Sequence, residues 1–227
     1  MPRYAFWLVM CAFLLVGCGG NEATTSSSSA PASTTVPVAG SATALEAVTA
    51  WLDALSIGRY RLADDTVVTD QFVLVLAVES YSVEFYDDLM ADGVDPSVST
   101  TFWESFEAGV RGFTGADITE VDVVGERRFT AYGRDFAEVE GQSPRGDLTI
   151  VSIRGDDETW RVDLLATFGP SFAPLFNLWV DRLPADVVHP VEDLKRQLPS
   201  LQVARDRVQP GSDARADLDG LLSRLGG

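Results

Sequence analysis

Apolar positions along this chain follow two different spacings. From Ala44 to about Gly112 they recur every three to four residues, which is the spacing of one face of a helix. After Gly115 they alternate with polar residues, as they do in half-buried strands. Helices followed by an antiparallel sheet predict an α+β domain.

The first predicted helix covers residues 44–57. Thr43 and Glu46 have the spacing of a capping box before it, and Gly58 ends it. A short second helix is expected over residues 59–68. The apolar stripe of the first helix consists of Leu45, Val48, Leu52 and Leu55, with Trp51 beside it.

Residues 70–91 are harder to assign. The seven apolar residues at 72–78 fit a buried strand or a buried helix equally well. Tyr81, Phe85 and Leu89 then continue with helical spacing, which favours a single helix over the whole stretch.

A second capping-box spacing, Thr101 with Glu104, predicts a helix that ends near Gly112. Beyond it, the turn residues divide the alternating region into short strands. The expected strands are 118–124, 127–132, 135–140, 148–154 and 159–165, with turns at Gly125-Glu126 and at residues 155–158.

In the last of these strands, side chains alternate between two faces. Trp160, Val162 and Leu164 share one face, and Arg161 and Asp163 share the other. We expect the apolar set to fill the core and the charged set to face solvent.

Two parts of this pattern resemble a known superfamily. The Trp-Leu-Asp-Ala-Leu run at 51–55 with Gly-Arg-Tyr at 58–60, and the closing hairpin at 150–165, are similar to the NTF2-like (SnoaL-like) superfamily. The resemblance covers residues 42–169. It implies a cone, in which a bent antiparallel sheet wraps the first helix and often leaves a pocket.

Residues 170–227 exceed what that fold needs, and their pattern is helical. One helix is expected across residues 172–183, with Pro174 tolerated in its first turn. Others are expected at 190–198 and 213–225. This helical extension is expected to pack against the cone or close its mouth, and the alternative is a partner-binding arm.

The amino terminus has the layout of a secretory signal: Arg3, then an apolar run, then Leu-Val-Gly-Cys at 15–18. The last four residues resemble the lipobox of bacterial lipoproteins. That resemblance implies that residues 1–17 are removed, that the Cys18 thiol receives diacylglycerol through a thioether, and that the new amino terminus is often acylated as well. It also implies that the protein is lipid-anchored on the extracytoplasmic face of the cell membrane. The alternatives are an uncleaved membrane helix, which needs roughly 20 apolar residues, and an ordinary secreted protein.

Residues 18–41 predict a flexible tether, because they are rich in Gly, Ser, Thr, Ala and Pro with the single charge of Glu22. A coil of this length spans about 25 Å. Cys11 would be lost with the signal, so the mature domain would have no free thiol, no disulfide and no cysteine-based metal site.

The chain carries 34 acidic and 17 basic residues, for a net charge of -17. This excess of negative charge argues against nucleic-acid binding. It also weakens attraction to anionic lipid, so the acyl chains are expected to supply the membrane affinity.

Motifs that carry chemistry are scarce. The only histidine is His189, expected in a solvated loop before Pro190, and one histidine without cysteine does not build the usual zinc site. No nucleophile elbow or phosphate-binding loop occurs. We therefore expect no cofactor and no metal.

Relatives in the NTF2-like superfamily include isomerases and cyclases that use a pocket Asp or Tyr to move a proton. By that resemblance Asp163, Tyr86 and Tyr132 are weak catalytic candidates, with Arg161 and Asp135 as neighbours. Since Asp163 is expected on the solvent face, we expect a non-catalytic domain that binds a small apolar ligand or an envelope protein. The alternatives are a proton-transfer enzyme and a purely structural subunit of an envelope complex.

Overall fold

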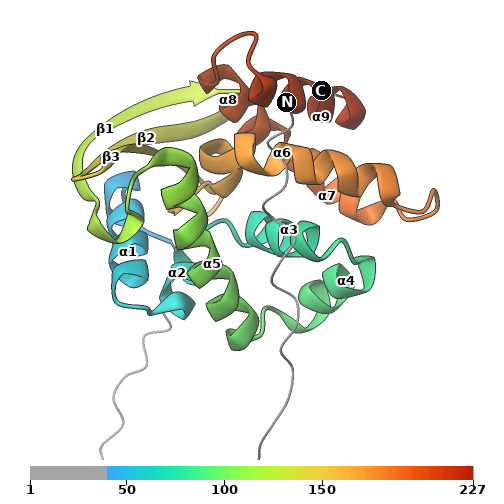
Figure 1. Cartoon of the computed structure of the whole chain (residues 1–227), viewed down its shortest axis with the longest axis horizontal. Coiled ribbons are helices and arrows are strands. Elements are labelled where there is room, and N and C mark those ends of the chain that lie inside the picture. The colour runs from blue at the N-terminus through green and yellow to red at the C-terminus, as the bar shows by residue number, and fades with distance from the viewer. Residues whose placement is uncertain (1–39, 227) are drawn as a thin grey trace, which may run out of the picture. The chain divides into compact units, whose positions relative to one another are not determined.

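The computed structural model describes residues 40–226 and confirms an α+β architecture (Figure 1). The expected signal peptide, Cys18 and nearly all of the tether lie outside these described residues. In chain order the elements are α1 (Ala44–Ser56), α2 (Tyr60–Thr66), α3 (Thr69–Ser80), α4 (Val83–Asp92), α5 (Pro96–Thr114), the 3₁₀ helix η1 (Ile118–Glu120), β1 (Asp122–Ala131), β2 (Arg134–Ser143), β3 (Gly146–Arg154), β4 (Trp160–Val162), α6 (Leu164–Arg182), α7 (His189–Arg196), α8 (Leu198–Arg207) and α9 (Asp213–Leu225).

The four strands form one antiparallel sheet in the order β1-β2-β3-β4. The tight turn between β3 and β4 lies at residues 155–158, as the sequence predicts. Two isolated bridges extend the β4 edge: Ser41 pairs with Trp160, and Val67 pairs in parallel with Val162. The chain before α1 and the chain after α2 are thereby fixed to the strand that closes the sheet.

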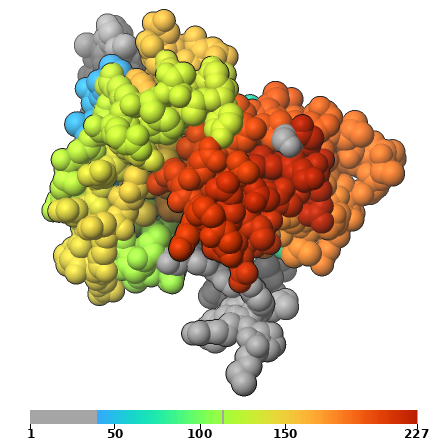
Figure 2. All heavy atoms as spheres, turned by 90° about the horizontal axis from the view of Figure 1, so that it is seen from above, coloured from blue at the N-terminus to red at the C-terminus, as the bar shows by residue number. Residues whose placement is uncertain are grey.

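Both faces of the sheet are covered. Helix α1 lies along one face, where its Trp51 shares a core with Val139, Ile150 and Val162. On the opposite face Phe136, Val151 and Ile153 pack with Ala166 of α6 and Val203 of α8. Figure 2 shows the red C-terminal helices directly beside the yellow-green strands. The C-terminal segment is therefore part of the same body as the sheet.

Helix α1 matches its prediction closely. The Thr43 hydroxyl accepts from the Glu46 backbone, and the Glu46 carboxylate accepts from the Thr43 backbone, which completes the capping box. Val48, Leu52 and Leu55 are buried as expected, but Leu45 is half exposed. The stripe therefore begins one turn later than the spacing suggests.

The single helix expected over residues 70–91 is wrong, because the structure has two helices there. Tyr81 adopts a left-handed conformation with φ of 54° and ends α3. The Ser82 hydroxyl then accepts from the Phe85 backbone and caps α4. A serine cap outweighs the continuous helical spacing of the apolar residues.

Helix α5 starts earlier and ends later than expected. Asp95 caps it by accepting from the Ser97 backbone, with Pro96 in the first turn. Thr101 lies inside the helix, where its hydroxyl donates to the Ser97 carbonyl instead of capping. The helix ends at Gly115, in the left-handed conformation that favours glycine.

The turn expected at Gly125-Glu126 is also wrong, since β1 runs through it. The register shifts between Val123 and Gly125, and this bulge accommodates the glycine within the strand. The reversal of direction comes at Tyr132 and Gly133, which both have positive φ.

The final strand is shorter than expected, and the C-terminal helices are more numerous. Helix α6 starts at Leu164 and runs across position 170, with Pro170 and Pro174 both inside it. Helix α8 is not predicted by the sequence pattern. Only Gln197 separates it from α7, so no run of turn residues marks a second helix there. Helix α9 is confirmed, and its stripe of Leu218, Leu221, Leu222 and Leu225 is buried.

Helices α6 and α8 approach each other most closely at Gly169. A Cβ added there would lie 2.9 Å from the Ala204 Cβ, which is on a rigid backbone. We expect Gly169→Ala to lower the free energy of unfolding by about 1–3 kcal/mol through overpacking. Denaturant unfolding measures the change.

Gly220 in α9 provides the matched control. The nearest atoms to an added Cβ there are 3.9 Å away, in the Asn177 side chain. Gly220→Ala should therefore stabilise the protein by about 0.5–1 kcal/mol through helix propensity. Equal stabilisation by both substitutions would contradict the close approach at Gly169.

Candidate functional site

Asp163 does not face solvent, which corrects the sequence-based expectation. Its side chain is fully buried, with 0% exposed. Oδ1 accepts a hydrogen bond from the Ala166 backbone at 2.7 Å, and Oδ2 accepts one from the Ser200 hydroxyl at 2.6 Å. The residue is the N-cap of α6, so β4 ends one residue before it.

Gln71 extends this cluster into α3. Its Oε1 accepts from the Leu165 backbone at 3.2 Å, and its Nε2 donates to Gln197 Oε1 at 3.2 Å and to the Ser200 hydroxyl at 3.1 Å. We call Gln71, Asp163, Gln197 and Ser200 the Asp163 network. It joins α3, α6 and the α7–α8 junction.

The sequence gives little indication of the Asp163 network. Gln71, Gln197 and Ser200 are single polar residues in separate helices, and all three are buried. Only Gln71 carries a signal, because it directly precedes the apolar run at 72–78. Their convergence depends on the packing of helices distant in sequence.

Burial raises the pKa of the Asp163 carboxyl, and the hydrogen bonds from Ser200 and Ala166 partly oppose that rise. Arg207 is a nearby cation: its guanidinium donates to the Ala166 carbonyl at 2.9 Å and pairs with Glu138 at 3.2 Å. Burial lowers the Arg207 pKa. Both Asp163 oxygens are thus occupied by the protein itself.

Tyr86 lies elsewhere, under α7. Its ring is buried and its hydroxyl donates to the Asp193 carboxylate. Burial, followed by the Asp193 hydrogen bond, raises the Tyr86 pKa above its usual range. The hydroxyl therefore holds α4 against α7.

Tyr132 lies in the β1–β2 turn and is half exposed. Its hydroxyl donates to Asp206 of α8, and that hydrogen bond raises its pKa. Asp135 accepts from the Thr130 hydroxyl at 2.8 Å on the same hairpin. The three catalytic candidates therefore have three different sets of partners, and the structure does not bring them into one site.

Arg161 and His189 also interact with carboxylates of the protein itself. Arg161 pairs with Asp157 at 2.6 Å in the β3–β4 turn. His189 is the first residue of α7, not a loop residue, and its Nε2 lies 2.7 Å from Asp87 Oδ1. Within residues 40–226, no group of three His, Cys, Asp or Glu side chains is placed to hold a metal ion.

The interior beneath the sheet is filled by aromatic side chains. Trp103 packs against Trp51, with ring centroids 6.0 Å apart, and stacks on Phe72 at 5.2 Å. Phe106 contacts Phe168 at 4.9 Å on the same side. The space between the sheet and these helices is thus occupied by the protein's own core.

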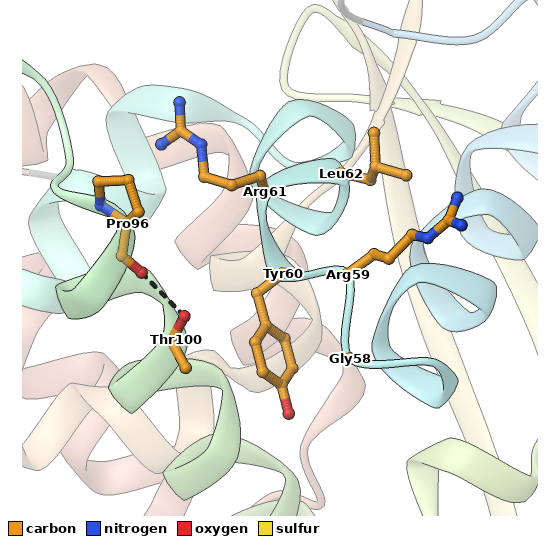
Figure 3. A pocket seen from close by; sticks show the side chains of 7 residues that line it. All are labelled: Gly58, Arg59, Tyr60, Arg61, Leu62, Pro96 and Thr100. Carbon is orange, nitrogen blue, oxygen red and sulfur yellow. Dashed lines mark hydrogen bonds between the residues drawn. The ribbon is translucent and has the colours of Figure 1, made fainter. Parts of the chain in front are cut away.

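Two open hollows lie on the surface of the described part of the chain. One, of about 350 Å³, lies between α2 and the start of α5 (Figure 3). The other, of about 300 Å³, lies between α1 and the segment entering β1. The first is lined by Gly58, Arg59, Tyr60, Arg61, Leu62, Pro96 and Thr100.

Among residues 40–226, none of the helices combines the length and the apolar character required to cross a bilayer. No protein-family model matches the chain, and neither a curated protein nor a solved structure is similar to it at a significant level.

Proposed function

We propose that this chain is a lipid-anchored extracytoplasmic protein of the cell membrane. The observation that carries the proposal is Leu-Val-Gly-Cys at 15–18, directly after an apolar run with a single arginine before it. The described residues begin at Gly40, and the sequence between Cys18 and that residue is rich in Ser and Thr, as expected of a spacer. The diacylglycerol group that the lipobox implies carries two acyl chains, which are enough for stable attachment, whereas a single chain gives weak, reversible membrane binding.

We propose further that the folded part is non-catalytic. A general base must reach its substrate, but Asp163 is buried and both its oxygens are hydrogen bonded inside the protein. Tyr86 and Tyr132 are bonded to Asp193 and Asp206. These contacts favour a structural role for all three candidates over proton transfer.

An envelope protein is the partner we propose, in preference to a small apolar ligand. The space beneath the sheet is filled by Trp51, Trp103 and Phe106, all of them buried. A ligand of drug size needs a pocket of about 300–1,000 Å³ that encloses most of its surface. The two hollows described above reach the lower end of that range, but both are open ones at the surface.

For the fold, we propose an NTF2-like cone with its helical extension packed on the outer face. Two features support this: α1 lies against the sheet, and Val67 pairs in parallel with Val162 at its closing strand. The resemblance carries the proposal and the packing agrees with it.

Replacing Cys18 tests the anchor. In cells fed an alkyne-tagged fatty acid, we expect the unaltered chain to incorporate the label and to fractionate with membranes. Cys18→Ser should lose the label completely, because serine has no thiol for the thioether. Cys11→Ser is the matched control and should keep the label, since Cys11 lies in the apolar run that is cut away. Label retained by Cys18→Ser would refute the anchor.

Native mass spectrometry separates the two classes of partner. The folded part, produced from Pro37 onward in its own host, should give the mass of the polypeptide alone. A reproducible additional small-molecule mass would overturn the preference for a protein partner and would identify the ligand class directly.

A further inference from the structure

The segment that joins α1 to the first turn of α2 differs in composition from the rest of the surface. We call residues 57–62, Ile-Gly-Arg-Tyr-Arg-Leu, the α1–α2 corner. It has two arginines and no acidic residue, in a chain with twice as many acidic as basic residues. Ile57 is 62% exposed, the highest value among the exposed large apolar side chains of the described residues, and Leu62 is 48% exposed.

The two arginines of the corner are available to an outside partner to different degrees. The Arg59 side chain is exposed and has no hydrogen bond or ion pair within residues 40–226. Arg61 donates to the Val94 carbonyl at 3.1 Å and approaches Asp64 at 3.5 Å, yet its side chain is 61% exposed. Asp64 also accepts hydrogen bonds from the Trp103 indole at 2.8 Å and from the Ser99 hydroxyl at 2.9 Å.

The shape of the α1–α2 corner favours an extended surface as its binding partner over a single small ion. Residues 58–62 of the corner line the hollow of about 350 Å³, together with Pro96 and Thr100. In Figure 3 the guanidinium groups of Arg59 and Arg61 point away from each other. A site for one small anion needs cations that converge on it, whereas diverging cations can each reach a different phosphate.

We propose that the α1–α2 corner is the face by which this domain contacts an anionic phospholipid surface. Arg59 and Arg61 bind lipid phosphates, and Ile57 and Leu62 enter the interface between headgroups and acyl chains. Each arginine near an anionic surface contributes about 1 kcal/mol, or about fivefold in binding.

The inference rests on the proposed lipid anchor, which would hold the domain close to a bilayer. The net charge of -17 repels the rest of the molecule from anionic lipid. Contact is therefore confined to the corner, and the domain is held in one orientation.

Site-specific fluorescence tests the contact without the natural anchor. The folded part from Pro37 onward has its own core and no cysteine, so a single introduced cysteine can carry a polarity-sensitive dye. An N-terminal histidine tag on nickel-chelating lipid replaces the acyl chain. The dye goes on Ile57→Cys or on the control Val188→Cys, a side chain 59% exposed in the described structure.

On vesicles of phosphatidylglycerol and phosphatidylcholine, we expect the dye at position 57 to brighten severalfold and shift to shorter wavelength. It should not change on phosphatidylcholine vesicles with the same tag lipid, and the dye at position 188 should not change on either. An equal response at both positions, or an equal response on both kinds of vesicle, would overturn the proposal.

Charge-reversal variants provide a second test of the lipid contact. Arg59→Glu with Arg61→Glu should abolish the response at position 57, whereas Arg134→Glu with Arg154→Glu, exposed arginines of the sheet, should leave it intact. Retention of the response in the corner variant would refute the phosphate contacts. Since the tag replaces Cys18, this result and the fatty-acid labelling of Cys18 succeed or fail independently.

Discussion

Trp103→Ala is expected to lower the free energy of unfolding by about 3–5 kcal/mol, the range for removing a large buried aromatic side chain. Trp103 has 0% exposed surface and contacts Trp51, Phe72 and Phe106. Its Nε1 also donates to Asp64 Oδ1 at 2.8 Å. The substitution therefore leaves both a cavity and a carboxylate with one partner fewer. Equilibrium denaturation with urea measures the loss.

Two further variants separate these contributions. Trp103→Phe keeps an aromatic ring but removes the donor to Asp64, and it should cost about 1–3 kcal/mol. Glu104→Ala, at the exposed neighbouring position, should change stability by less than about 0.5 kcal/mol. A loss for Trp103→Ala no larger than for Glu104→Ala would contradict the position of Trp103 at the centre of the core.

Asp163→Ala is expected to cost about 3 kcal/mol, from the lost helix cap and from a buried hydroxyl left without its acceptor. The unsatisfied groups would be the Ala166 backbone N–H and the Ser200 hydroxyl. Asp163→Asn keeps a capping oxygen and nearly the same shape, so most of the stability should remain. Thermal unfolding of the two variants measures the difference. A larger loss for Asn than for Ala would refute the capping role.

The difference in stability between wild type and Asp163→Asn should also depend on pH, with a sign that follows from the Asp163 pKa. Because burial raises the pKa of Asp163 in the folded state, the native protein binds this proton more tightly than the unfolded chain does. The contribution of Asp163 to stability is therefore fully present below the unfolded value of 3.8 and is lost as pH rises through the higher folded value. Relative to wild type, Asp163→Asn should gain stability as pH rises from the unfolded value of 3.8 through the higher folded value. A relative stability independent of pH would contradict the raised pKa.

Local signals predict this fold well where they determine the structure by themselves. The capping box at Thr43 and the leucine stripe of α9 are such signals, and both are confirmed. The α+β order is confirmed for the same reason, because it follows from periodicity. Where two local signals conflict, as at Ser82, the apolar spacing predicts a continuous helix and the cap divides it.

The candidate site was predicted less well, for a different reason. Alternation along 159–165 places Asp163 on the outer face only if the strand continues through it. The strand ends at Val162, and Asp163 then turns inward to cap α6 and meet Ser200 from a helix 37 positions later. Contacts between residues so far apart leave no pattern in a single sequence.

The coverage of the second sheet face by α6 and α8 has a consequence for how the chain is made. Phe136, Val151 and Ile153 precede Val203, their partner from α8, by about fifty residues or more. While the chain emerges from the ribosome, these strands present uncovered apolar side chains until the last helices have been synthesised. A chain that stops before α8 would keep that surface open and become a substrate for chaperones and proteases.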